Sequence, residues 1–392
     1  MKRLACVIIC TAGAALAMTG SASASKTDVY AALGDSYTAG PLVLPLGGPP
    51  LGCLRSAHNY PSLVRAAIGA AAFRDVSCAG ATTTDMRSPQ VVLGASNPPQ
   101  FGALTSATTL VTIGIGGNDV GLVGAATTCV GLGVLAPTGT ACRTKFTARD
   151  GGDLLNDRIA VAAQSIAAML QAVHVRSPQA RVLLVGYPAV APRSGGCYPL
   201  VPLSDDDLSY LDEKLRATNA MLAAQAAAND AEYVDTYDDS VGHDVCTLPG
   251  TRWFEGLVPT NLAYPLHPNA LGEASMARSV LRVLGRPRPG PLLGVIRRAQ
   301  KAIPAGGVAH LRFTLSRAAG VTLTLQRSLG HGRYAPARTL RTVSARLGDN
   351  VVRLSATQFG RRAGLFRITA SLAGGSSQST NIRIRRPRPR RA

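Results

Sequence analysis

The first 285 residues alternate between short apolar runs and longer segments whose apolar residues recur every three or four positions. Segments 155–173 and 208–222 have this helical spacing, and Ser204 is well placed to cap the second helix. A last helix is expected from about Pro268, as a first-turn proline, to Leu284. The apolar runs have the length of buried strands and are Val29–Leu33, Leu110–Ile115, Arg181–Tyr187 and Ala231–Asp235. This alternation predicts a parallel sheet with helices on both faces, a three-layer α/β/α domain over residues 25–285.

The pattern changes after residue 285. Arginine, proline and glycine fill residues 286–291 and predict a linker over 286–306. Beyond the linker every second residue is apolar in several stretches, for example at Leu311, Phe313 and Leu315. A period of two in several short strands predicts a small Ig-like β-sandwich over residues 307–386. Residues 387–392 form a basic tail with no apolar side chain large enough to anchor it.

The first 24 residues have the composition of a signal peptide. Lys2 and Arg3 precede an uncharged apolar run, and Ala22 to Ala24 provide small residues for cleavage. The alternative is an uncleaved membrane anchor, but the run is short for a bilayer span. The sequence therefore predicts a protein that is secreted to the extracellular space.

Cysteine usage agrees with export. Two of the eight cysteines lie in the signal peptide, and the other six are expected to form disulfides, with 15 pairings open. No two cysteines have the C-x-x-C spacing of zinc or redox sites, so we expect neither a metal nor a cofactor. The six are Cys53, Cys78, Cys129, Cys142, Cys197 and Cys246.

The net charge of +19 is concentrated at one end of the chain. Residues 286–392 contain 22 of the 41 basic residues and one acidic residue, Asp349. This end lacks the interleaved aromatic residues of nucleic-acid-binding proteins, so no nucleic-acid partner is predicted. An anionic membrane or cell-wall surface is the expected partner, and a generic solvated surface is the alternative. We expect a monomer.

Two segments could provide a nucleophile and its base. Ser36 follows Gly34 and Asp35 where the first strand ends, at the sheet edge where open α/β folds place their sites. His267 stands before the last helix, and histidine is the usual base for a serine hydroxyl because its pKa lies near neutral pH. His243 is the main competitor, but its setting is that of a loop histidine.

Two further segments could stabilise an oxyanion. A loop of small residues at 77–83 contains Gly80, and small residues let backbone N–H groups approach a substrate. Asn118 follows two glycines at the end of the second strand and could direct a side-chain N–H at the same atom. Turn chemistry alone could also explain either segment. A G-x-G-like stretch at 131–136 is not a dinucleotide site, because no acidic residue follows at the required distance.

Taken in order, the four segments resemble the conserved blocks of the GDSL/SGNH hydrolase family, and the chain is most similar to secreted actinobacterial lipases and esterases. The resemblance covers about residues 27–285. It implies Ser36 as the nucleophile and His267 as the general base. It also implies an oxyanion hole formed by the N–H groups of Ser36 and Gly80 with the Asn118 side chain. The disulfide pairs that it implies are Cys53–Cys78, Cys129–Cys142 and Cys197–Cys246.

One position departs from the family pattern. Many members carry aspartate three residues before the catalytic histidine, where this chain has Tyr264. A carboxylate there would hold the tautomer of the imidazole ring. We therefore expect a Ser36–His267 dyad whose histidine is oriented by the Tyr264 carbonyl, with Asp244 as the alternative partner.

The resemblance implies a serine carboxylester hydrolase that acts on acyl lipids or related esters. The apolar insertion Pro41–Leu54 lies beside the nucleophile and is expected to line an acyl pocket or to act as a covering loop held by Cys53. Deacetylation of a polysaccharide is the second enzymatic hypothesis. A non-catalytic cell-surface binding protein is the third, and the four intact segments argue against it.

Overall fold

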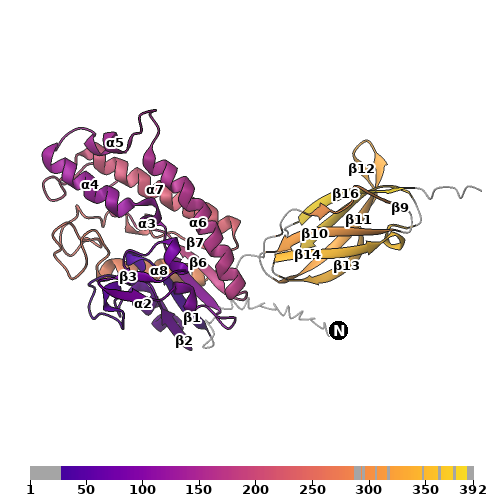
Figure 1. Cartoon of the computed structure of the whole chain (residues 1–392), viewed down its shortest axis with the longest axis horizontal. Coiled ribbons are helices and arrows are strands. Elements are labelled where there is room, and N and C mark those ends of the chain that lie inside the picture. Colours follow the sequence, from indigo (N-terminus) through magenta and orange to yellow (C-terminus); the bar gives the residue numbers. More distant parts are fainter. Residues whose placement is uncertain are drawn as a thin grey trace, which may run out of the picture.

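The computed structural model describes residues 28–286, 293, 296–304, 307–315, 318–346, 348–360, 363–373 and 377–385. The predicted signal peptide, the basic tail and most of residues 287–295 lie outside these residues. Figure 1 shows an α/β region followed along the chain by an all-β region.

The α/β region is built on a five-stranded parallel sheet with the strand order β2-β1-β5-β6-β7. The four predicted strands are present, and a short strand before residue 77 adds a fifth at the edge. The strands are β1 (Val29–Gly34), β2 (Ala72–Asp75), β5 (Leu110–Gly114), β6 (Arg181–Val185) and β7 (Glu232–Val234). The alternating directions of neighbouring side chains give the sheet two apolar faces.

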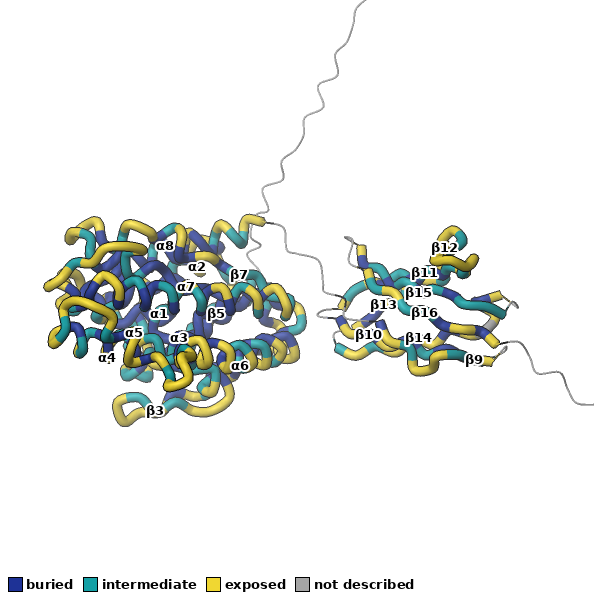
Figure 2. Tube along the Cα trace, turned by 90° about the horizontal axis from the view of Figure 1, so that it is seen from above, coloured by how far each residue is buried: buried dark blue, intermediate teal, exposed yellow. Residues whose placement is uncertain are grey.

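Helices cover both faces, as the sequence predicts (Figure 1). One face packs against α6 (Leu154–Arg176) and α7 (Asp205–Ala228) through sheet residues such as Leu33. The other packs against α2 (Tyr60–Ile68) and α8 (Ala270–Leu284). Figure 2 shows the buried strands between these exposed helical surfaces. The remaining elements are α1 (Ser36–Ala39), α3 (Gly117–Val120), α4 (Leu122–Leu135), α5 (Ala141–Phe146), β3 (Gln90–Val92), β4 (Ala95–Asn97) and short 3-10 turns.

Within the described residues, α6 alone is long and apolar enough to span a membrane by length and composition. Its apolar stripe, including Ile166 and Leu170, is buried in the core beside the sheet. This helix is explained by packing in the α/β region.

The helix ends agree with the sequence at one site and correct it at another. Ser204 caps α7 by accepting a hydrogen bond from the Asp207 N–H, as expected. The last helix begins two residues later than predicted, at Ala270: Asn269 is its cap and accepts from the N–H groups of Leu271 and Gly272. Pro268 therefore precedes the helix. The first N–H groups of a helix have no partner within it, and the Asn269 side-chain oxygen accepts hydrogen bonds from two of them.

The all-β region is a sandwich of two sheets. One has the order β14-β10-β8, and the other has β12-β11-β15-β16-β9 with β13 paired to β11. Alternate residues from both sheets, Phe313 and Phe366 among them, form one apolar core. The strands are β8 (Arg297–Arg298), β9 (Ala302–Pro304), β10 (Val308–Leu315), β11 (Ala319–Gly330), β12 (Arg333–Tyr334), β13 (Arg338–Ala345), β14 (Gly348–Ser355), β15 (Gly364–Leu372) and β16 (Ser377–Arg385).

The predicted linker is too long. Strands β8 and β9 lie inside residues 286–306, and Leu293, Ile296 and Ile303 are buried in the core of the sandwich. These strands are two and three residues long, too short to show a period-two pattern in the sequence. The sandwich therefore includes Leu293 and the described residues of β8 and β9.

Three disulfides lie in the α/β region: Cys53–Cys78, Cys129–Cys142 and Cys197–Cys246. These are the pairs implied by the family resemblance. The first joins the loop before α2 to the loop after β2, and the second joins α4 to α5. Each closes a loop in the unfolded chain and contributes roughly 2–4 kcal/mol in the entropy model.

Candidate active site

Ser36 occupies a tight turn between β1 and α1. Asp35 caps this short helix by accepting a hydrogen bond from the Tyr37 N–H at 2.9 Å. Gly34 has a φ of +151°, and a Cβ built on it would lie 2.5 Å from the Gly114 carbonyl oxygen. Only glycine fits there, so the Gly-Asp-Ser order fixes the backbone that presents the serine.

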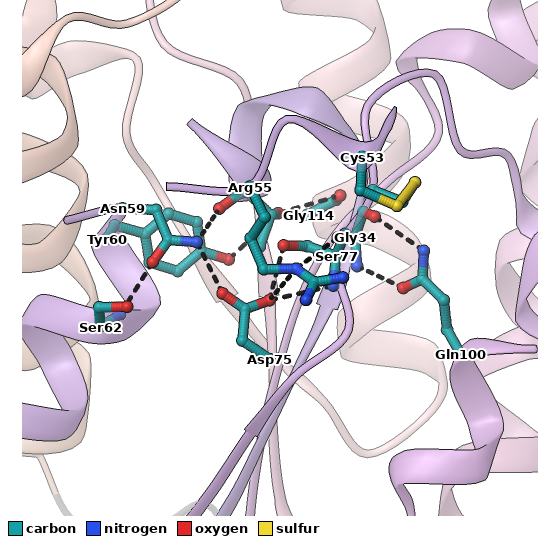
Figure 3. A network of polar contacts seen from close by, with 12 residues as sticks. Gly34, Cys53, Arg55, Asn59, Tyr60, Ser62, Asp75, Ser77, Gln100 and Gly114 are labelled. Atoms are coloured by element: carbon teal, nitrogen blue, oxygen red, sulfur yellow. Dashed lines mark hydrogen bonds and ion pairs between the residues drawn. A yellow bond between two sulfur atoms is a disulfide. The ribbon is translucent and has the colours of Figure 1, made fainter. Parts of the chain in front are cut away.

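A buried polar network of side chains supports the backbone of this turn (Figure 3). The Gln100 side chain bonds both the N–H and the carbonyl of Gly34, at 2.8 and 2.9 Å. Asn59 donates to the Thr38 carbonyl at 2.9 Å and to Asp75 at 2.6 Å. Side chains from two other segments therefore fix both the end of β1 and the helix α1 that begins at Ser36.

The structure brings Ser36 and His267 together although 231 positions separate them. His267 Nε2 lies 2.8 Å from Ser36 Oγ, and Nδ1 lies 2.7 Å from the Pro265 carbonyl oxygen. A carbonyl oxygen only accepts, so Nδ1 carries the proton and the Nε2 lone pair faces the serine hydroxyl. This tautomer is the one that can remove the serine proton.

The prediction that the Tyr264 carbonyl orients His267 is wrong. That carbonyl accepts the backbone N–H of His267 at 3.1 Å and closes a β-turn over residues 264–267. Leu266, with a φ of +61°, is the third residue of this turn, and the turn directs the Pro265 carbonyl at the imidazole instead. The alternative partner, Asp244, accepts a bond from the Cys246 N–H in its own loop.

Two neighbours hold the histidine loop. The Tyr37 hydroxyl donates to the Leu266 carbonyl at 2.7 Å, and its ring lies 4.9 Å from the imidazole. The backbone of Glu255 pairs with that of Leu266 and His267. Burial raises the pKa of the Glu255 carboxyl, but hydrogen bonds from Asn261, Asn269 and Thr260 outweigh it and bring the pKa to about 2. The competing histidine, His243, is a loop residue stacked on Trp253, as expected.

Burial controls the electrostatics of the pair. It lowers the pKa of His267 to about 4, with the Pro265 hydrogen bond opposing it, so the ring is neutral at pH 7. Burial also raises the pKa of Asp35 to about 7, opposed by the hydrogen bond from Tyr187. A neutral, correctly oriented imidazole is what proton removal from a serine requires.

Three hydrogen-bond donors face the same cavity as Ser36. Asn118 gives one amide hydrogen to the Ala81 carbonyl at 2.9 Å, which leaves the second free. Gly80 has a φ of +78°, and neither its N–H nor that of Ser36 donates a hydrogen bond to any other described residue. The structure therefore gathers the three groups predicted for an oxyanion hole around one space.

Sequence reasoning missed the residues that connect these loops. Asp119, next to Asn118, accepts hydrogen bonds from the Thr83 N–H at 3.1 and 3.2 Å and so fixes the Gly80 loop. The Tyr187 hydroxyl accepts the Gly117 N–H at 2.7 Å and donates to Asp35. Tyr187 ends a predicted strand, and nothing in its local sequence indicates that its hydroxyl would reach two other strand ends.

Ser36 and His267 lie between two cavities. The first has a volume of about 910 Å³, including its opening to solvent, and its walls are formed largely by α4 and α7. Its apolar lining includes Leu122, Val123, Ala126, Val130, Val201, Leu203, Leu208, Leu211, Leu215 and Val245. The second, of about 800 Å³, is lined by Gly80, Asn118 and Tyr264, and by Pro41, Gly52 and Leu54 of the predicted insertion. The insertion thus lines the second cavity and is also anchored by the disulfide of Cys53.

A family profile matches the region that contains this geometry. The profile of the GDSL-like Lipase/Acylhydrolase family matches residues 32–274. The chain belongs to this family. A lipase from Streptomyces coelicolor, Lipase 2, is 39% identical over 276 residues, which cover 69% of this chain and 90% of that lipase.

Solved structures of this family have the same fold. Phospholipase A1 from Streptomyces albidoflavus NA297 is 26% identical with a TM-score of 0.55, covering 66% of this chain and 99% of that one. The extracellular lipase from Streptomyces rimosus is 27% identical with a TM-score of 0.54 and the same coverage. The family region is the α/β region, since the profile match ends inside α8.

We predict that Tyr187 positions the site of this family member. Tyr187→Phe removes the hydroxyl between Asp35 and Gly117, so the serine turn and the Asn118 loop lose their shared hydrogen bonds. An unpaired buried group costs about 1–3 kcal/mol, so kcat on a soluble ester should fall roughly 5- to 150-fold while KM changes little. Steady-state kinetics on p-nitrophenyl butyrate measure both.

Tyr210→Phe is the matched control. It removes another tyrosine–carboxylate bond, to Asp153, and Tyr210 lines neither cavity beside Ser36. Its kcat should stay within about twofold of the parent. Equal losses in the two variants would show that Tyr187 contributes only to stability.

Proposed function

We propose that this ester hydrolase cleaves the carboxylic esters of acyl lipids outside the cell, with Ser36 as nucleophile and His267 as general base. The hydrogen bond between Ser36 Oγ and His267 Nε2 carries the proposal, because it pairs a hydroxyl with a neutral imidazole of the required tautomer. His267 removes the proton as Ser36 attacks the ester carbonyl, and returns it to the departing alcohol. A water then repeats the sequence on the acyl-enzyme.

The developing oxyanion would lie among the N–H groups of Ser36 and Gly80 and the free amide hydrogen of Asn118. Their positions on three different strand-end loops are fixed before substrate binds, through Asp119, Thr83 and the Gly34 network. Donors that need not reorganise stabilise an oxyanion more effectively than water does.

The lining of the first cavity supports an acyl substrate. It is apolar over most of its surface, as a hydrocarbon chain requires and a polysaccharide does not. The related phospholipase A1 and lipases are consistent with such a substrate. The second cavity, beside Gly80 and Tyr264, would take the alcohol portion. The three disulfides and the extracellular relative support secretion, and recovery of the mature chain from culture medium checks it.

Blocking the first cavity tests the substrate assignment. Ala126 lies on α4 and lines this cavity, so Ala126→Trp should exclude part of a long acyl chain. Excluding about four methylenes removes roughly 3 kcal/mol of binding, so kcat/KM for p-nitrophenyl decanoate should fall about a hundredfold. The acetate ester should be hydrolysed at the parent rate.

Thr127→Trp is the control for this test. Thr127 is the next residue of the same helix, is exposed and does not line the cavity. It should leave the ratio of decanoate to acetate hydrolysis unchanged. If Ala126→Trp also leaves that ratio unchanged, acyl chains bind elsewhere.

A further inference from the structure

One face of the β-sandwich carries arginines directly opposite one another. On the sheet β14-β10-β8, Arg312 of β10 pairs with Arg297 of β8, and His310 pairs with Arg353 of β14. Directly opposed residues of an antiparallel pair project to the same face. Arg297, Arg312 and Arg353 are exposed, whereas the intervening residues of β10 are buried in the core. We call this outward surface the arginine face.

No ion pair compensates the charge of the arginine face, and its one acidic residue among the described positions, Asp349, lies at the end of β14 opposite Thr314. All ion pairs among the described residues lie between residues 55 and 282, and none reaches this face. Arg341 of β13 donates to the Arg353 carbonyl at 2.8 Å and adds a further cation beside it. Like charges directly opposed on a sheet are destabilising, so folding alone gives no reason for this arrangement.

The outer face of the other sheet differs. Its outward positions combine hydroxyl side chains, among them Thr322, Thr369 and Ser379, with the arginines Arg367 and Arg383, but no two arginines of this sheet are directly opposed within the described registers. The arginine face is therefore distinguished by the direct opposition of Arg312 and Arg297, and not by the number of its arginines.

We propose that the arginine face binds anionic phospholipid surfaces. A guanidinium matches a phosphate oxygen pair in geometry and stays charged at any physiological pH. Val308 and Val351 lie on the same face and are 41% and 53% exposed, so apolar side chains accompany the cations. That combination favours a lipid surface over a fully hydrated acidic polymer. The proposal rests on the proposed function, since it would hold an acyl-lipid hydrolase where its substrate lies.

Vesicle partitioning tests the proposal on the full chain. Both variants are made in a Ser36→Ala background, so that no lipid is hydrolysed. The first replaces Arg297, Arg312 and Arg353 with glutamine. The second replaces Arg333, Arg383 and Arg385, which are exposed outside the arginine face, and so removes the same charge. Sedimentation with vesicles of phosphatidylcholine, with and without phosphatidylglycerol, is measured at low and high ionic strength.

The first triple variant should lose roughly a hundredfold in partitioning onto vesicles with phosphatidylglycerol, about fivefold for each arginine. The second should lose less than about tenfold, and high salt should remove most binding of the parent. Equal losses in the two triples, or binding of the parent that is independent of phosphatidylglycerol, would overturn the proposal. The proposal would also be overturned if the first triple variant lost binding to an acidic polymer matrix but not to vesicles. Vesicle partitioning is measured without ester hydrolysis, so a negative result would leave the ester-hydrolase proposal intact.

Discussion

Replacing Ser36 with alanine should abolish ester hydrolysis. The substitution removes the single oxygen that lies 2.8 Å from His267 Nε2, and no other hydroxyl of the described residues lies within hydrogen-bonding distance of that nitrogen. Loss of the nucleophile in a serine hydrolase costs about 10⁶-fold in kcat. Turnover of p-nitrophenyl butyrate, measured at a high enzyme concentration, gives the residual rate.

The fold should survive this change. Asp35 still caps α1 and Gln100 still holds Gly34, since neither contact uses the serine hydroxyl. Ser62→Ala on α2 is the control, because its hydroxyl forms no hydrogen bond within the part of the chain described here. Both variants should melt within a few degrees of the parent, about what a change of 1 kcal/mol or less produces. Ser36→Ala activity within tenfold of the parent would remove Ser36 from the mechanism.

Replacing His267 with alanine should cost kcat nearly as much as loss of the serine. Without the imidazole, no base lies within reach of Ser36 Oγ among the described residues. The two residues act as a unit, so a loss of about 10⁴- to 10⁶-fold is expected, and the double variant should be little worse than either single one. Asp244→Asn and Tyr264→Phe are the controls and should stay within about threefold, because a main-chain carbonyl orients the ring.

The pH profile gives a second measurement of the same assignment. In the proposed mechanism the neutral imidazole is the base, and its lowered pKa of about 4 means that the active form persists as the pH falls. The contribution of His267 to kcat/KM should therefore be constant above about pH 5 and should fall as the pH drops through 4. If kcat of Asp244→Asn fell by a large factor, the partner that orients His267 would be a carboxylate and not a main-chain carbonyl.

The sequence predicts the sheet and the site residues because both depend on local pattern. Val29–Gly34 and Leu110–Gly114 are apolar runs between turns, and each ends at a residue of the site. In a parallel sheet the carboxyl ends of neighbouring strands meet at one edge, so Ser36 and Asn118 had to lie close together. His267 is predicted from its place directly before the last helix, and the family resemblance implies the same residue.

What the sequence did not predict depends on contacts between distant segments. A type II-like turn places the Pro265 carbonyl, rather than that of Tyr264, against the imidazole, and no side-chain pattern reports which carbonyl will point there. Tyr187 reaches Asp35 across 152 positions. The short strands β8 and β9 are stabilised by the rest of the sandwich and not by a pattern of their own. Their sequence therefore resembles that of a linker.

The carbonyl that orients His267 has a consequence for mutational robustness. In a Ser-His-Asp triad one codon change can erase the third member, whereas every amino acid placed at position 265 retains a carbonyl oxygen. The vulnerable feature is instead the conformation of residues 264–267, where Leu266 occupies left-handed backbone space. Leu266→Gly would relieve that preference and Leu266→Val would oppose it. If His267 is the base, selection on the group that orients it acts on turn geometry. Random mutagenesis should then find inactivating substitutions at the turn and at the residues that support it, Tyr37 and Glu255, and not at an acidic residue.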